Sequence, residues 1–218
     1  MYPSRPSRRP PLPIRTLEDF TGQLVGPYYL TGILGLGSVG TVYRAVDTSI
    51  RQRIPFAVKC LPKKAARHIG VNLGREIYLH EAATGCPHVL SLHDIFEEKL
   101  YIFLVFDLCE ADLFKAIWHR RVYWRNDALI KKAFIEILDG VSACHEREIY
   151  HRDLKPDNIM CKADGTGMQI GDFGLATQDI VCRSGPRGTP YYMSPGQSGV
   201  TTQIIIELTG FENAGQVM

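Results

Sequence analysis

The most informative stretch of this sequence is His151-Arg152-Asp153-Leu154-Lys155-Pro156-Asp157-Asn158, and a second short stretch, Asp172-Phe173-Gly174, follows it. Just before the first stretch, residues 127–146 repeat apolar side chains at a helical period, which predicts one amphipathic helix. Its apolar face consists of Leu129, Ala133, Ile137 and Val141. Residues 112–117 show the same period. The second half of the chain is therefore predicted to be mainly helical.

The first half of the chain has a different pattern, with short runs rich in β-branched and aromatic residues that predict strands. These runs are residues 28–30, 41–46, 56–60, 90–93 and 101–106, and one helical pattern centred on residues 75–82 interrupts them. Several strands in succession with a single helix favour a small antiparallel sheet over repeated βαβ units. The sequence thus predicts an α+β fold.

A glycine-rich stretch, Gly35-Leu36-Gly37-Ser38-Val39-Gly40, lies between the first two predicted strands. This spacing alone is weak evidence, because dinucleotide-binding folds share it. Those folds begin a helix at the last glycine, whereas Thr41-Val42-Tyr43 favours a strand. We therefore expect a hairpin tip whose backbone N–H groups can approach phosphate closely.

A lysine ends the apolar run Ala57-Val58-Lys59, nineteen residues after the last glycine of the loop. Most lysines lie on solvated surfaces. Next to a phosphate-binding loop, however, Lys59 can pair with phosphate oxygens. Glu76 on the following helix is a candidate carboxylate to hold it, the alternative being an ordinary surface acid.

Taken in order, these features resemble the eukaryotic protein kinases: residues 151–158 are similar to their HRDLKPxN catalytic loop, and Asp172-Phe173-Gly174 to their DFG motif. Lys155 and the stretch Gly188–Pro195 resemble the serine/threonine class. Further short stretches resemble fungal kinases of the Ran/Pat type, which are associated with nutrient response and meiosis. These stretches are residues 76–80, 105–109, 126–131 and 173–177. The resemblance implies a two-lobed kinase-like fold, with an antiparallel N-lobe over residues 28–108 and a partial helical C-lobe over residues 109–195.

The resemblance also implies a reaction, transfer of the ATP γ-phosphate to a Ser or Thr hydroxyl of a protein substrate with Mg²⁺ as cofactor. Asp153 would accept the hydroxyl proton, and Lys155 would neutralise the γ-phosphate. Asn158 and Asp172 would hold Mg²⁺ through oxygen atoms. Thr189 would lie beside Asp153 and Lys155.

The same resemblance assigns an ATP site to the cleft between the lobes. Gly35, Gly37 and Gly40 would cover the phosphates, and Lys59, held in place by Glu76, would bind them. The remaining residues would surround adenine: Leu34, Val42 and Ala57 above it, Met160 below it, Phe106 as gatekeeper, and Asp107 and Cys109 as backbone hinge contacts.

Regulation through the activation loop is suggested by Arg152, which in kinases receives a phosphate. Thr177 and Ser184 are available in the loop, but the position that resembles the usual phosphorylation site is Gly185. We expect either phosphorylation at Ser184 or a loop that needs none.

Composition and charge exclude several classes of protein. With 45% hydrophobic and 22% charged residues, the 218-residue chain is neither disordered throughout nor fibrous. Residues 1–15 carry four arginines and no acid, while the remainder has 21 basic and 23 acidic residues. Nucleic-acid binding over a broad surface needs a basic face on the folded domain, so it is not expected.

The cysteine spacing and the lack of long apolar runs bear on compartment. Six cysteines occur without a CxxC pair, which favours reduced thiols over zinc or disulfide frameworks. No run of eighteen apolar residues and no secretory start are present, so no membrane association is predicted. We expect a cytoplasmic or nuclear protein that is a monomer when folded.

The two ends of the chain resemble no kinase segment. Residues 1–20 are basic and proline-rich, which predicts a flexible tail, with a proline-motif ligand as the alternative. At the other end, Gly196 replaces the family's glutamate, and residues 196–218 match nothing in it. Three interpretations compete: an active kinase or part of one, an inactive ATP-binding or interaction module, and a tail that is intron sequence read as coding. We favour the first for biochemical class and the third for the tail; the second applies if the chain has no independent activity without the remainder of a kinase C-lobe.

Overall fold

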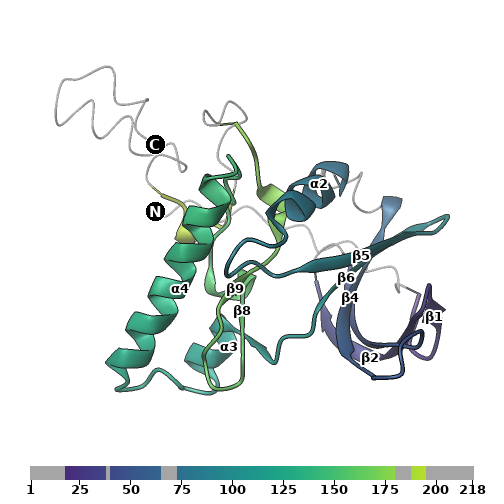
Figure 1. The fold of residues 1–218 in the computed structure, drawn as a ribbon, viewed down its shortest axis with the longest axis horizontal. Coiled ribbons are helices and arrows are strands. Elements are labelled where there is room, and N and C mark those ends of the chain that lie inside the picture. The colour runs from purple at the N-terminus through teal and green to yellow at the C-terminus, as the bar shows by residue number, and fades with distance from the viewer. Residues whose placement is uncertain (1–17, 38–39, 65–72, 180–187, 195–218) are drawn as a thin grey trace, which may run out of the picture.

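The computed structural model describes residues 18–37, 40–64, 73–179 and 188–194. They form two lobes, a curled sheet with one helix and a mainly helical part (Figure 1). The fold is therefore the two-lobed α+β arrangement that the sequence predicts. The proline-rich start, Ser184, Gly185 and residues 195–218 lie outside the described residues.

The N-lobe sheet has six strands in the order β1-β2-β3-β4-β6-β5, and every neighbouring pair is antiparallel. In the sequence, helix α2 lies between β4 and β5. The bounds are β1 Leu24–Val25, β2 Tyr28–Leu36, β3 Thr41–Asp47, β4 Pro55–Pro62, α2 Leu73–Ala83, β5 Leu92–Glu97 and β6 Tyr101–Asp107. The predicted strands are confirmed, except that the one expected from residue 90 begins at Leu92. The backbone N–H of Leu90 instead donates to the Ile170 carbonyl of the C-lobe, at 2.9 Å.

The N-lobe core begins earlier in the chain than the sequence indicates. Phe20, which we assigned to the tail, is 6% exposed. Its ring packs edge-on against those of Tyr43, Tyr101 and Phe103 at centroid distances of 4.9–6.4 Å. Burial of an aromatic ring offsets the entropy of ordering this segment, so the tail ends before Phe20 rather than at residue 20.

Within the described residues, the C-lobe contains two helices, a small sheet and three short 3-10 turns. Its elements are β7 Ala111–Asp112, α3 Leu113–Trp118, α4 Asp127–His145, η1 Pro156–Asn158, β8 Ile159–Cys161, β9 Gln169–Ile170, η2 Phe173–Leu175 and η3 Pro190–Tyr192. Both helices begin at side-chain caps: Asp112 Oδ1 accepts from Lys115 N at 2.7 Å, and Asn126 Oδ1 accepts from Leu129 N at 3.1 Å. In the sheet β7-β8-β9, strands β8 and β9 connect residues 151–158 to Asp172.

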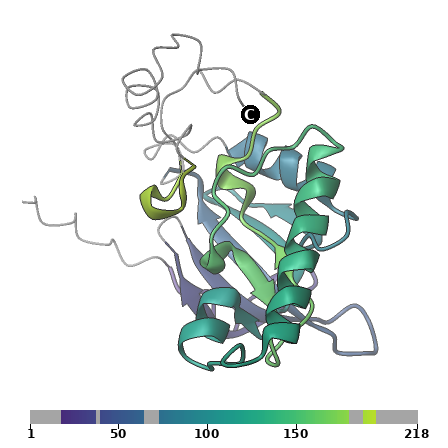
Figure 2. The same ribbon diagram turned by 90° about the vertical axis from the view of Figure 1, so that its left-hand side faces the viewer.

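Helix α4 lies at the outer edge of the C-lobe in both views (Figures 1 and 2). On the face predicted from the sequence, Ala133 is buried and the other three residues are half-buried. A second row, which the sequence analysis missed, is more exposed: Ile130 47%, Phe134 61%, Ile135 45% and Leu138 51%. An apolar row of this kind leaves α4 with surface that water does not solvate favourably.

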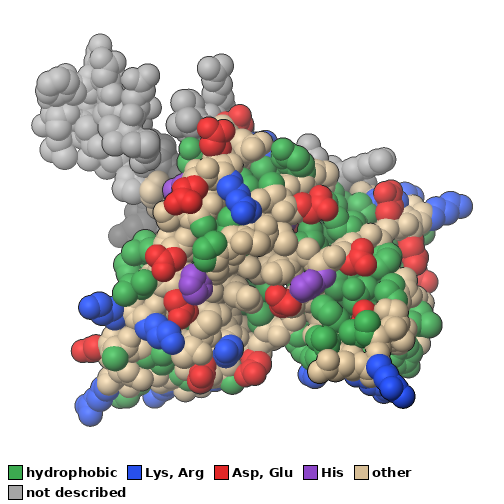
Figure 3. Space-filling model, viewed as in Figure 1, with side chains coloured by type: hydrophobic (Ala, Val, Ile, Leu, Met, Phe, Trp, Pro, Cys, Tyr) green, Lys and Arg blue, Asp and Glu red, His purple; other side chains and the backbone are tan. Residues whose placement is uncertain are grey.

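On the face shown in Figure 3, acidic and basic side chains are interspersed, so no large area of one sign forms there. None of the described helices is long and apolar enough to cross a membrane.

Candidate active site

Lys59 on β4 lies between two carboxylates that come from distant parts of the chain. Its Nζ is 3.0 Å from Glu76 Oε1 on α2 and 3.4 Å from Asp172 Oδ1. Burial favours the neutral amine, but Asp172 and Glu76 outweigh it and raise the pKa of Lys59. Lys59 is therefore a fixed cation, and the predicted partnership with Glu76 is present.

The neighbouring side chains of Asp172 and Phe173 differ in exposure: Phe173 is buried and Asp172 is half-exposed. Phe173 is fully buried, with its ring centroid 4.6 Å from that of His80 and 5.0 Å from that of His151. Asp172 has a left-handed backbone, φ 59°, which is costly for a residue with a side chain and is typical of functional sites. Its carboxylate remains half-exposed, and the charge of Lys59 lowers its pKa. Asp172 is thus an ionised oxygen donor held at the site.

Asp153 is the centre of a hydrogen-bond network. Its Oδ1 accepts from both the N–H and the hydroxyl of Thr189, each at 2.7 Å, and its Oδ2 accepts from Lys155 Nζ at 2.8 Å. Lys155 Nζ also donates to Thr189 Oγ1 at 2.7 Å. Partial burial raises the pKa of Asp153, but these hydrogen bonds outweigh it, so the net pKa is lowered. The structure brings together the three residues that we predicted to meet here.

Asn158 and His151 hold this network in place. Asn158 is buried, and its Nδ2 donates to the Asp153 carbonyl at 2.8 Å and to Asp153 Oδ2 at 3.1 Å. The backbone carbonyl of Asn158 accepts from Gly171 N at 2.8 Å, which connects residues 151–158 to the residue before Asp172. His151 Nε2 donates to the Gly171 carbonyl at 2.8 Å, and its Nδ1 accepts from Asp153 N at 3.3 Å.

His151 was not assigned a role from the sequence, although it begins the quoted stretch. Its two hydrogen bonds require a neutral ring with the proton on Nε2. Burial agrees with this requirement, because it lowers the pKa of His151. His151 therefore supports the Asp153 and Asp172 segments together.

The glycine-rich stretch forms the predicted hairpin between β2 and β3, with Leu36 opposite Thr41. Gly37 N donates to the Gly40 carbonyl at 2.8 Å, which closes the tip. At Gly40, a Cβ would lie 2.1 Å from the Cys60 carbonyl oxygen, so this position admits only glycine. Gly35 is opposite Val42 in the ladder, and Val42 is opposite Lys59, so the loop lies at the end of the sheet that carries the lysine.

Only some of the residues predicted to surround adenine pack in one cluster. Ala57, Cys109 and Met160 pack against the same cluster as the buried Phe106. Leu34 is 44% exposed on β2 and does not join it. The side chain of Asp107 hydrogen-bonds His93 Nε2 at 2.7 Å, which leaves its backbone as the part available at the hinge.

Thr177 and Ser184 are the hydroxyl residues available in the activation loop, and of these the structure describes Thr177, not the predicted Ser184. It is fully buried, and its backbone pairs with that of Tyr150 in both directions. Thr177 is therefore closed to a modifying enzyme in this conformation. Arg152, whose φ of 63° is also left-handed, donates from Nε to the Leu175 carbonyl at 3.1 Å.

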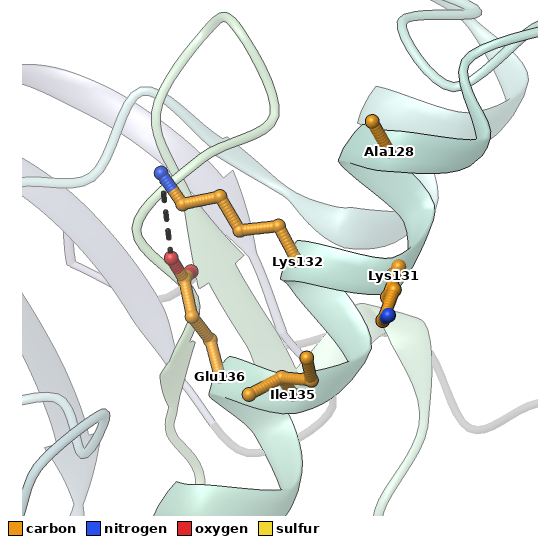
Figure 4. Close-up of a pocket in the computed structure, with 5 residues that line it drawn as sticks. All are labelled: Ala128, Lys131, Lys132, Ile135 and Glu136. Carbon is orange, nitrogen blue, oxygen red and sulfur yellow. Dashed lines mark ion pairs between the residues drawn. The ribbon is translucent and has the colours of Figure 1, made fainter.

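A shallow hollow of about 310 Å³ lies elsewhere, on α4 (Figure 4). It is lined by Ala128, Lys131, Lys132, Ile135 and Glu136. The side chains of Lys132 and Glu136 point toward each other there, 3.9 Å apart. It shares no residue with the polar network around Asp153 and Asp172, which is where the reactive groups converge, so we place the site at that network.

Comparison with known proteins agrees with this geometry. Residues 28–199 match the model of the family described as protein kinase domain, so the match extends four residues beyond Pro195, where the resemblance was expected to stop. The chain is 37% identical over 181 residues to the negative regulator of sexual conjugation and meiosis of Schizosaccharomyces pombe, covering 82% of this chain and 38% of that protein. It is 31% identical to the serine/threonine-protein kinase ksp1 of the same yeast, covering 75% and 36%.

A third relative is the calcium/calmodulin-dependent protein kinase type II alpha chain of Drosophila melanogaster, 36% identical over 74% of this chain and 31% of that protein. The chain thus spans less than two-fifths of the length of these relatives. Because the family match covers most of the chain and the two lobes carry the expected polar network, the chain belongs to the protein kinase family.

Proposed function

We propose that this chain carries the catalytic groups of an ATP-dependent protein serine/threonine kinase. The observation that carries the proposal is the position of a hydroxyl group at Asp153. The Thr189 hydroxyl donates to Asp153 Oδ1 and accepts from Lys155 Nζ, both at 2.7 Å. A Ser or Thr hydroxyl of a substrate in the same position would meet the same carboxylate and the same cation.

The chemistry of this arrangement follows from the two charges. The hydrogen bonds that lower the pKa of Asp153 keep it ionised at neutral pH, so it orients the hydroxyl and accepts its proton as the oxygen is phosphorylated. Lys155 is placed to neutralise negative charge that develops beside that oxygen. Phosphoryl transfer of this kind depends on positioning and charge stabilisation, and the residues supply both.

Members of this family use ATP and Mg²⁺, and the residues present fit both. Lys59 is a half-buried cation for phosphate oxygens, next to a glycine hairpin with free space around Gly35. Asp172 and Asn158 offer oxygen atoms, the ligands that Mg²⁺ prefers. Because Asn158 Nδ2 is used by Asp153, its Oδ1 is the atom that would bind the ion. The bound ion would supply charge neutralisation of the phosphates.

The two relatives from fission yeast are named as a regulator of conjugation and meiosis and as a serine/threonine kinase. We extend the serine/threonine class to this chain, with a protein hydroxyl as substrate. A cytoplasmic or nuclear location and a monomeric state are part of the proposal.

The test is phosphate transfer from radiolabelled Mg-ATP to a basic test protein by the 218-residue chain. We expect Asp153→Asn to lower the rate by about 10²- to 10⁴-fold, the range for loss of a general base. Asp157→Asn, at an exposed residue of the same loop, is the matched control and should retain activity. Both variants should still be stabilised against heat by Mg-ATP.

The outcomes separate the competing interpretations. If the unmodified chain is stabilised by Mg-ATP but transfers no phosphate, the inactive nucleotide-binding module replaces the kinase. If Asp153→Asn transfers phosphate as fast as Asp157→Asn, the role of Asp153 is wrong.

A further inference from the structure

The segment from the last residue of α3 to the start of α4, residues 118–125, carries two large exposed rings. The chain contains two tryptophans, Trp118 and Trp124, and both lie here, 66% and 72% exposed. Tryptophan is largely buried on average in folded proteins and is enriched where partners bind. Two tryptophans that remain mostly in water therefore mark a surface that a partner can cover. We call residues 118–125 the Trp–Arg loop.

The Trp–Arg loop is also basic. Arg120, Arg121 and Arg125 are exposed, and the segment contains no acid. Arg125 Cζ lies 6.0 Å from the ring centroid of Trp124, so a cation and an aromatic face occupy the same place. Within the part of the chain that the structure describes, none of the three guanidinium groups forms an ion pair with a carboxylate. Their positive charge is therefore available to an anionic group of a partner.

The backbone holds two of these arginines in a costly conformation. Arg121 and Arg125 have φ values of 51° and 54°, in the left-handed region that glycine adopts at less cost. Residues of this kind persist where the surrounding structure fixes the chain, and they cluster at functional sites. For the fold alone glycine would suit both positions, yet the chain carries a cation at each.

Contacts with the rest of the C-lobe fix the shape of the Trp–Arg loop. Val122 N donates to the Ala116 carbonyl of α3 at 3.2 Å, and the Tyr123 hydroxyl donates to the Gly165 carbonyl, between β8 and β9, at 2.8 Å. Val122 and Tyr123 also pack against the buried cluster that contains Ala116. Because the surface is preformed, a partner that binds it loses less conformational entropy in ordering it.

Acidic residues limit the positive area to this loop. Glu110, whose backbone carbonyl accepts from Arg120 Nη2 at 3.3 Å, has its carboxylate bonded to Ala163 N at 2.8 Å. Asp164 precedes the glycine that Tyr123 contacts. Single-stranded nucleic acid needs a basic groove that follows at least about four nucleotides, and anionic membranes attract clusters of about four to eight basic residues. Three arginines between acids are too few for either, so a short peptide fits better.

We propose that the Trp–Arg loop is a docking site for an acidic segment of a partner protein. Asp or Glu side chains of that segment pair with the arginines, whose planar guanidinium groups match carboxylates. An apolar side chain of the segment packs against Trp118 or Trp124. The loop shares no residue with the network around Asp153, so this inference does not depend on the proposed function.

The probe is a short peptide of glutamates around one central leucine, and the control peptide has glutamine in place of every glutamate. Tryptophan emission of the 218-residue chain reports on the loop directly, because both tryptophans lie in it. We expect the glutamate peptide to move the emission to shorter wavelength, as the rings leave water, and the glutamine peptide to leave it unchanged. The measurement is made at about 0.1 M salt, where the screening length is about 10 Å and distant charges contribute little.

The decisive variant combines Arg121→Gln with Arg125→Gln, and anisotropy of a labelled glutamate peptide measures its Kd. We expect the Kd to rise about tenfold, the scale of two exposed ion pairs. The matched control combines Arg51→Gln with Arg53→Gln, two exposed arginines between β3 and β4. It removes the same charge from another surface, so its Kd should stay within about twofold of the unmodified chain.

Two further variants test the rings. Trp118→Ala or Trp124→Ala should raise the Kd by about tenfold or more, as expected for an aromatic residue that carries binding energy. Both side chains are exposed, so their removal should leave the melting temperature within about 1 °C of the unmodified chain. A loss of affinity therefore reports lost contacts rather than lost folding.

Other anions decide between kinds of partner. Phosphatidylserine vesicles and a single-stranded oligothymidylate are titrated under the same conditions. If either binds more tightly than the glutamate peptide and loses affinity in the double arginine variant, the loop recognises a membrane or a nucleic acid and the proposal is overturned. The proposal is also overturned if the glutamate peptide does not bind below about 1 mM, or if the two double arginine variants bind it equally.

Discussion

His80 should make the stability of this protein depend steeply on pH in the mildly acidic range. The side chain is 3% exposed on α2, and its Nε2 donates to the Leu90 carbonyl at 2.7 Å. Its ring lies between those of Phe106 and Phe173, with centroids 5.1 and 4.6 Å away. Burial in this apolar position lowers the pKa of His80 from 6.5 to about 4.

The sign and size follow from proton linkage. Between pH 6.5 and about 4, the unfolded state binds a proton at His80 that the folded state does not, so stability falls as pH falls. A pKa lowered to about 4 predicts that His80 alone removes about 1 kcal/mol of stability between pH 7 and 5.5. The loss reaches about 2 kcal/mol at pH 4.5.

The assay is urea denaturation at pH 7, 5.5 and 4.5 for the unmodified chain and for His80→Gln. Glutamine can donate to the Leu90 carbonyl but does not titrate, so this variant should lack the loss of about 2 kcal/mol. His151 remains in both proteins, and its contribution cancels in the comparison. Leu79→Ala, at a fully buried neighbour on α2, is the control for lost packing.

Leu79→Ala should be about 2–5 kcal/mol less stable than the unmodified chain at every pH, with the same slope. His80→Gln should be less stable at pH 7 because it loses ring contacts, but its stability should fall less on acidification. If the pH slopes of His80→Gln and the unmodified chain are parallel, the argument from burial is refuted.

Two further predictions concern packing at the glycine hairpin and on α4. Gly40→Ala should destabilise the protein by about 1–3 kcal/mol and lower the melting temperature by roughly 5 °C, because the added Cβ would press on the Cys60 carbonyl. Gly35→Ala, where nothing lies within 4 Å of the added Cβ, should melt within about 1 °C of the unmodified chain, and equal losses in both would contradict this. The double change of Phe134 and Leu138 to Glu should raise the concentration at which light scattering begins by about threefold, because it breaks the exposed apolar row; unchanged scattering would show that the row does not drive association.

The predictions from sequence succeeded where the pattern depends on residues that are close together in the chain. A strand or helix pattern depends on residues within one element, so α2, α4 and most strands were identified, with boundaries off by a few residues. The glycine hairpin and the stretch around Asp153 are also local, and their order along the chain was enough to predict the two lobes.

The pairing of Lys59 with Glu76 could be predicted because a phosphate-binding lysine needs a carboxylate partner and Glu76 lies on the next predicted helix, seventeen residues on. The same cannot be done for Arg75 and Asp179, which form an ion pair at 3.3 Å although they lie 104 residues apart. No local period marks either residue, and both would be read as ordinary surface charges. Their meeting depends on how α2 packs against η2.

What the sequence alone determined is the set of elements, the order of the reactive residues and the class of reaction that they indicate. Only the tertiary structure decided that Phe20 belongs to the core, that Thr177 is buried and that His80 is held neutral beside Phe173. The physical reason is that burial is a property of the packed whole. A side chain loses its water only when elements from distant parts of the chain close around it, and the pKa and exposure of that side chain are set by those neighbours.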